Sequence, residues 1–79
     1  MTKLNNMNAE LLEFIVKPTS FVRDKRIKDL DFPRSAIIGG IIRNGEGLIA
    51  LGDFMIRAGD RIVVCCLPRS INKVEKLFL

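Results

Sequence analysis

The sequence contains no histidine, tryptophan or tyrosine among its 79 residues, and only two cysteines. Without histidine the chain lacks the commonest general base and any Ser-His or Cys-His nucleophile. Two cysteines alone are too few ligands for a zinc site. The missing tryptophan and tyrosine leave the usual stacking platform for single-stranded nucleic acid poorly supplied. These absences predict a protein that is neither an enzyme nor a metalloprotein.

Long hydrophobic runs and a signal peptide are missing as well. No apolar run approaches the roughly 20 residues needed to cross a bilayer, and the first ten residues lack the apolar segment of a signal peptide. We therefore expect a cytoplasmic protein. Cys65 and Cys66 are adjacent, and neighbours in a strand point to opposite faces, so a bridge between them would be strained. We interpret them as two core residues in a reducing compartment.

Aliphatic residues are abundant. Hydrophobic residues make up 48% of the chain, with isoleucine, valine and leucine in short runs such as AIIGGII and IVVCCL. A chain of this length forms one domain and covers a smaller share of its apolar surface than a larger domain does. The excess predicts a partner surface or a dimer interface.

The net charge is +4, with a sequence pI near 9.5. Basic residues gather between Arg23 and Lys28, where they are interleaved with acidic ones. A solvated segment of mixed charge is the favoured interpretation. A nucleic-acid-binding module that uses this segment is the alternative, and it predicts binding to polyanions with a steep salt dependence.

Periodicity and turn residues predict an α+β fold: a small two-layer domain with a mostly antiparallel sheet, a short helix after the first strand and a C-terminal helix. Residues 1–8 are expected to form a flexible lead-in, and residues 9–79 the domain. Asp24 and Ser70 are the expected N-caps. The expected elements are strand 10–17, helix 24–30, strand 36–43, turn 44–47, strand 48–51, short strand 54–56, strand 61–67 and helix 70–79.

Two glycine-containing patterns are candidate sites. The pairs Gly52-Asp53 and Gly59-Asp60 each suit a tight turn, and we interpret both aspartates as solvated turn residues rather than catalytic carboxylates. Gly39-Gly40 lies inside a predicted strand, where glycine is unfavourable. A bulge or close backbone packing is the favoured explanation, and close approach of a ligand is the alternative.

Taken together, these residues resemble the TrkA C-terminal (RCK C-terminal) domain family over about residues 10–77. The resemblance depends on two spaced aliphatic residues, an apolar strand ending in arginine, a glycine turn and two Gly-Asp turns. Asp24 stands where the family often has glycine, and Ala50 where many members have proline. The matching residues are Lys25, Ile27, Leu30, Ile41, Arg43, Gly45, Gly52, Asp53, Gly59, Asp60, Ile62 and Val64.

The resemblance implies a cytoplasmic regulatory domain of a potassium or other cation transport system, at the inner face of the membrane through its transporter partner. Such domains form homodimers, and some bind a small effector such as cyclic di-AMP at the dimer interface. They usually follow a nucleotide-binding domain, so NAD(H) or ATP would belong to a preceding part of a longer protein, and this chain contains no cofactor site. The expected effector-binding residues are Gly40, Ile41, Ile42, Arg43 and Asn44, with Arg43 facing an anionic group. A dimerisation module without a ligand is the alternative.

Overall fold

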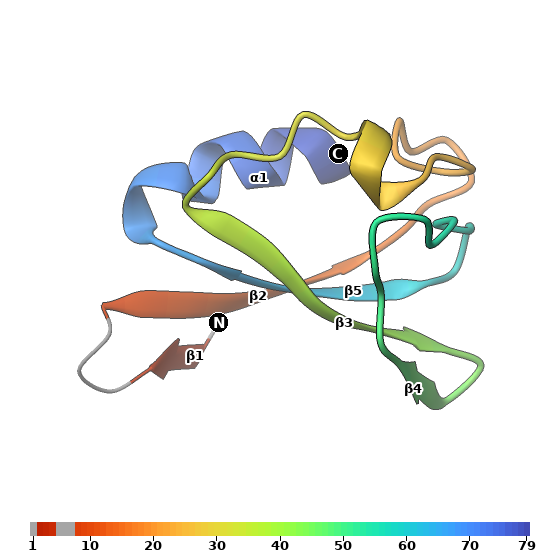
Figure 1. Cartoon of the computed structure of the whole chain (residues 1–79), viewed down its shortest axis with the longest axis horizontal. Coiled ribbons are helices and arrows are strands. Elements are labelled where there is room, and N and C mark those ends of the chain that lie inside the picture. Colours follow the sequence, from red (N-terminus) through yellow and green to blue (C-terminus); the bar gives the residue numbers. More distant parts are fainter. Residues whose placement is uncertain (1, 5–7) are drawn as a thin grey trace.

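The computed structural model describes residues 2–4 and 8–79. Its five strands form one sheet in the order β1-β2-β5-β3-β4, and all neighbouring strands are antiparallel (Figure 1). This confirms the predicted α+β class. The elements are β1 (Thr2–Leu4), β2 (Ala9–Ile15), the 3₁₀ turn η1 (Ile27–Asp29), β3 (Ala36–Arg43), β4 (Glu46–Leu48), β5 (Arg61–Cys66), the 3₁₀ turn η2 (Pro68–Ser70) and α1 (Ile71–Phe78).

The sheet carries all of its helical structure on one side. Helix α1, turn η1 and the loops on either side of η1 lie on the upper side of the sheet in Figure 1. Val74 and Phe78 are the buried residues of α1, and the Phe78 ring stacks on Phe14 of β2 at a centroid distance of 4.6 Å. Burial of these apolar residues against the sheet holds the two layers together. The core comprises Leu12, Val16, Val22, Leu30, Ile38, Ile41, Ile56, Ile62, Val64, Cys66, Val74 and Phe78.

A tight hairpin joins β3 to β4. Asn44 and Gly45 have φ angles of 52° and 78°, and Arg43 pairs directly with Glu46. Positive φ at both central residues defines a two-residue type I′ turn, the geometry that Asn-Gly favours. The returning strand therefore begins at Glu46, and the predicted strand over residues 48–51 is wrong beyond Leu48.

The glycine pair of β3 marks a β-bulge. The pairing of β3 with β5 shifts register between Ile38 and Gly40, which confirms the interpretation of Gly39-Gly40 as a bulge. Because the bulge adds one residue, Ile38 and Ile41 both face the core although they are three apart.

The segment between β2 and β3 contains less helix than predicted. Only Ile27–Asp29 is helical, as a single 3₁₀ turn, and Arg26 rather than Asp24 precedes it without a side-chain cap. Asp24 instead has a φ of 61°, a conformation that glycine adopts more easily.

Two further expectations about local structure are wrong. Residues 54–56 do not form a strand, because only Met55 pairs, in an isolated bridge with Arg26. Ser70 does precede α1, but its hydroxyl bonds to that of Ser35 and does not cap the helix. In both cases the partner, Arg26 for Met55 and Ser35 for Ser70, lies far away in the sequence, so local patterns do not reveal it.

The N-terminal segment contributes a strand that the sequence did not predict. Within residues 1–8, expected to be a lead-in, Thr2–Leu4 forms β1 and pairs with β2. Residue 1 and residues 5–7 lie outside the described residues. In the part of the chain that the structure describes, no helix has the length and apolar character to cross a membrane.

Candidate functional site

The five predicted site residues lie around the end of β3 but on different sides of the sheet. Gly40 and Ile42 face the side opposite α1, which we call the open face. Ile41 points into the core, with 1% of its surface exposed. Arg43 lies on the same side of the sheet as Ile41, and Asn44 is exposed at the tip of the hairpin. The structure thus brings Gly40 and Ile42 together and separates them from the Arg43 side chain.

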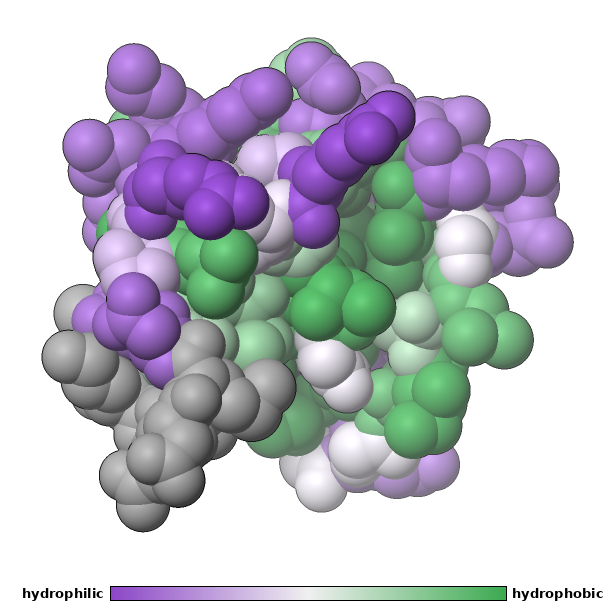
Figure 2. All heavy atoms as spheres, turned by 60° about the vertical axis from the view of Figure 1, so that its left-hand side comes forward, coloured by the Kyte–Doolittle hydropathy of each residue, from purple (hydrophilic) through white to green (hydrophobic). Residues whose placement is uncertain are grey.

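The open face is apolar. Its residues alternate with the core residues along each strand, and Ile15 and Ile37 are 58% and 66% exposed. Figure 2 shows hydrophobic residues gathered over the sheet, below the hydrophilic upper layer. The side chains that form the face are Leu11, Ile15, Ile37, Ile42, Val63 and Cys65, with Glu13 and Arg61 paired among them at 3.4 Å.

A shallow hollow of about 400 Å³ lies on this face above the glycine pair. Gly40 forms part of its floor, and Ile42, Leu48 and Ile49 form part of its wall. A Cβ at Gly40 would approach the Leu48 carbonyl oxygen only to 3.7 Å, which is ordinary contact. Glycine is therefore not required here by the chain's own packing, and its effect is to leave the hollow open.

Arg43 is held by its own chain. Its Nε donates to Asp60 Oδ1 at 2.7 Å, and its Nη2 donates to Asp60 Oδ2 at 2.7 Å and to the Met55 carbonyl oxygen at 2.9 Å. The guanidinium also lies over the Phe54 ring, 4.8 Å from its centroid. One edge of the guanidinium therefore forms a bidentate ion pair with the Asp60 carboxylate. Nη1 has no hydrogen-bond partner among the described residues.

Asp60 is the second member of this pair, and the expectation that it is solvated is wrong. Its side chain is 1% exposed, and Oδ2 also accepts the Arg57 backbone N–H at 2.8 Å. Burial alone would raise the pKa of the Asp60 carboxyl, but the bonds from Arg43 and Arg57 and their positive charges lower it below its ordinary value. Asp53, in the other Gly-Asp pair, is 84% exposed, and its one ion pair among the described residues is with Lys28. The two similar motifs therefore have different roles.

Arg57 extends these contacts to a second loop. Its Nη1 donates to Asp24 Oδ1 at 2.8 Å, and the Asp24 backbone N–H donates to the Ile56 carbonyl oxygen. The end of β3, the turn before β5 and the loop after β2 are thereby joined. Sequence reasoning missed this network because residues 24, 43 and 60 are distant in the chain and their types alone do not pair them.

The described residues show no catalytic arrangement. Burial, followed by the nearby Glu10, Cys65 and Glu75, raises the pKa of the Cys66 thiol, which disfavours the reactive thiolate. No three Cys, Asp or Glu side chains in the described part of the chain are grouped so as to hold a metal ion. What the arrangement offers is an apolar surface beside a rigidly held arginine.

Residues 11–79 match the family model of the TrkA-C domain. The chain belongs to the TrkA-C domain family. Over 78 residues it is 31% identical to the Trk system potassium uptake protein TrkA homolog 1 of Methanosarcina mazei, covering 99% of this chain and 17% of that protein. Over 68 residues it is 41% identical to the Trk system potassium uptake protein TrkA homolog of Archaeoglobus fulgidus, and this match covers 86% of this chain and 15% of that protein. This TrkA-C domain thus spans about a sixth of the length of the curated relatives it matches.

A solved structure described as "Structure of RCK domain with cda" shares the fold, with a TM-score of 0.74 and 23% identity. The match covers 87% of this TrkA-C domain and 97% of that chain. A potassium/proton antiporter NhaP of Alkalimonas amylolytica is 28% identical over 71 residues, covering 90% of this chain and 12% of the antiporter. Family membership confirms the resemblance seen in the sequence and the interpretation of the chain as a regulatory rather than catalytic domain.

Proposed function

We propose that this TrkA-C domain regulates a potassium or other cation transport system. It acts in the cytoplasm, at the inner face of the membrane, by contact with the transporter subunit. The match to the family over residues 11–79 carries the proposal, and relatives named as potassium uptake proteins support it. The similarity to an antiporter is the reason why the proposal includes cation transport systems other than potassium uptake.

The open face supports a homodimer. It presents apolar side chains from three adjacent strands, and Ile37 of β3 is 66% exposed on it. Two identical faces related by a two-fold axis are self-complementary and bury these side chains together. A homodimer therefore accounts for the apolar excess that one small domain does not cover.

The hollow above Gly40 supports a small effector at that interface, and a cyclic dinucleotide is the candidate. Ile42 offers an apolar contact for a base, and Asn44 offers amide donors at the hairpin tip. The Arg43 side chain lies on the other side of the sheet, where it holds Asp60, so the proposed contact of its Nη1 with a phosphate requires the effector to extend from the hollow around the hairpin end of β3. Ile41 contributes from below as a core residue. NAD(H) or ATP would bind in another domain of a longer protein.

Regulation follows from binding across the two-fold axis. An effector that contacts both subunits favours the relative orientation in which both sets of contacts are made. The orientation of the two domains is then passed to the transporter as a rigid-body change. The hydrogen bonds from Arg43 to Asp60 and Met55 make the end of β3 rigid enough to transmit it.

A thermal-shift screen combined with a mass measurement tests the proposal. Cyclic di-AMP at about 100 times its Kd stabilises a binding domain by about 2.7 kcal/mol, or roughly 10–20 °C for a domain of this size. Gly40→Val fills the hollow without requiring a positive φ and should abolish the shift. Ile37→Glu should yield monomers, whereas Leu79→Glu, exposed outside the open face, should leave the mass unchanged.

Other outcomes separate the alternatives. A dimer that responds to no cyclic dinucleotide, adenine nucleotide or cation would identify a structural dimerisation module. Retention on a polyanion with a steep salt dependence would favour the nucleic-acid alternative. A monomer insensitive to every candidate effector would refute the proposed mode of regulation.

A further inference from the structure

The loop between β2 and η1 presents an exposed aromatic ring on an ordered scaffold. Phe21 is 63% exposed, yet its neighbours Ser20 and Val22 are buried. Two consecutive turns fix the loop, since the Ser20 N–H bonds to the Lys17 carbonyl and the Arg23 N–H bonds to the Ser20 carbonyl. The exposure of Phe21 is therefore a feature of the fold, and folding gains little from the ring.

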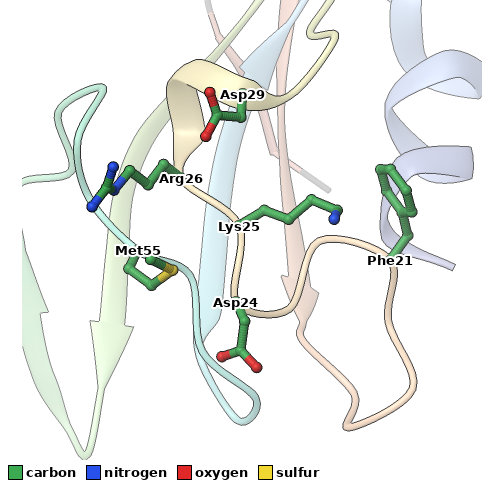
Figure 3. Close-up of a pocket in the computed structure, with 6 residues that line it drawn as sticks. All are labelled: Phe21, Asp24, Lys25, Arg26, Asp29 and Met55. Atoms are coloured by element: carbon green, nitrogen blue, oxygen red, sulfur yellow. The ribbon is translucent and has the colours of Figure 1, made fainter.

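Basic residues surround this ring. Residues 17–28 contain five lysines and arginines and one aspartate, a net charge of +4, as large as that of the whole chain. The Nζ of Lys25 lies over the Phe21 ring, 4.7 Å from its centroid. Figure 3 shows Lys25 extending toward Phe21, with Arg26 pointing away on the other side.

Several of these charges are not neutralised by the protein. Among the described residues, Lys17, Lys25 and Arg26 have no carboxylate within salt-bridge distance. Asp24 is occupied by Arg23 and Arg57. A second hollow lies beside the Phe21 ring, and the two carboxylates that line it are those of Asp24 and Asp29.

An exposed aromatic ring within a group of unpaired cations matches the chemistry of an anionic lipid surface. Lysine and arginine are attracted to the negative potential of the headgroups, and the ring is accommodated at the boundary of the acyl chains. We propose that residues 17–26 bind directly to an anionic bilayer, with Phe21 entering the interface and Lys17, Lys25 and Arg26 contacting phosphates.

The position of the loop is compatible with the dimer. It lies with η1 and α1 on the side of the sheet away from the open face (Figure 1). Both copies in a dimer joined by their open faces therefore keep this loop accessible. Lipid binding adds to the proposed regulatory function but does not require an effector, so each succeeds or fails separately.

The absence of tryptophan and tyrosine makes a direct test simple. Phe21→Trp introduces a single reporter, to be mixed with vesicles of equimolar phosphatidylcholine and phosphatidylglycerol. We expect a blue shift of its emission and quenching by brominated acyl chains, both reversed by high salt because screening weakens the attraction. Leu79→Trp, also at an exposed apolar position, should show neither change.

Charge variants test the role of the cations. Lys17→Gln combined with Arg26→Gln removes two unpaired charges and should lower vesicle partitioning by about 25-fold, near fivefold for each charge. Lys73→Gln combined with Lys76→Gln removes the same charge from the exposed surface of α1 and should change partitioning less than threefold. Phe21→Ala should lower partitioning by about tenfold.

Three outcomes would overturn the proposal. The first is equal losses in the loop and helix variants, which would indicate attraction by net charge alone. The second is full partitioning of Phe21→Ala, which would exclude entry of the ring. The third is retention on immobilised polyglutamate without any vesicle binding, which would assign the loop to an acidic protein surface.

Discussion

The substitution Asp60→Asn should destabilise the domain strongly. It keeps the shape of the side chain but removes the negative charge of the carboxylate that accepts two hydrogen bonds from Arg43. Removing one partner of a buried pair typically costs 3–5 kcal/mol, because the other charge is left without compensation. Arg43 is 32% exposed, so water partly solvates the remaining charge. We therefore expect a loss of about 2–3 kcal/mol.

The matched control comes from the other Gly-Asp pair. Asp53 also forms an ion pair, with Lys28 at 2.8 Å, but it is 84% exposed. Asp53→Asn should change the stability by no more than about 0.5 kcal/mol, as is usual for exposed pairs.

Urea unfolding followed by circular dichroism measures both variants. Protein concentration must be equal throughout, since dimerisation makes stability depend on it. A loss of about 2–3 kcal/mol corresponds to a melting temperature lower by roughly 10–20 °C. If Asp60→Asn cost no more than Asp53→Asn, the assignment of Asp60 as a buried structural partner of Arg43 would be refuted.

Three further predictions concern pH, the hairpin and the thiols. The folded-state pKa of Asp60 is lowered, so its contribution to the free energy of unfolding is complete above its unfolded-state pKa of about 3.9 and is lost as the pH falls through the folded-state value. In acid titrations the stability of Asp60→Asn should therefore fall less steeply than that of the unmodified domain, and parallel stability curves would contradict this. Gly45→Ala should cost about 1 kcal/mol because φ is 78°, whereas Gly47→Ala, with equal space but no positive φ, should be neutral within about 0.5 kcal/mol; equal chemical unfolding curves would count against the type I′ turn. A thiol reagent should modify half-buried Cys65 first and reach Cys66 only on unfolding, as peptide mass mapping would show, because Cys66 is buried and its pKa is raised; early labelling of Cys66 would disprove its burial.

Local sequence signals were sufficient for most of the elements. The alternation in residues 10–17 and the apolar runs at 36–43 and 61–67 predicted strands that the structure has at Ala9–Ile15, Ala36–Arg43 and Arg61–Cys66, because their side chains fit a half-buried or buried sheet. Asn44-Gly45 formed the turn its composition favours, although the predicted loop was two residues too long. The fold class followed from these signals and their order.

The candidate site could be predicted only in part. Sequence reasoning located the end of β3 and paired Arg43 with an anionic group, but it did not identify Asp60 as a carboxylate 17 residues away that occupies the arginine. Nor could it identify the open face, because which side of a strand is covered depends on where α1 packs. Such tertiary choices depend on the whole chain, whereas turns and strands depend on a few neighbouring residues.

The strand order has a consequence for synthesis and folding. β5 lies between β2 and β3, and these two strands, consecutive in the chain, have no pairing with each other. The sheet therefore cannot form while residues 61–66 remain within the ribosome. Until then the apolar strands β2 and β3 have been synthesised but lack β5, the strand that pairs with both. Folding that depends on such distant pairing is slow and exposes strand edges to aggregation. A chain truncated before Arg61 would thus lose its entire sheet apart from two hairpins, and the domain should be acquired in a single late step.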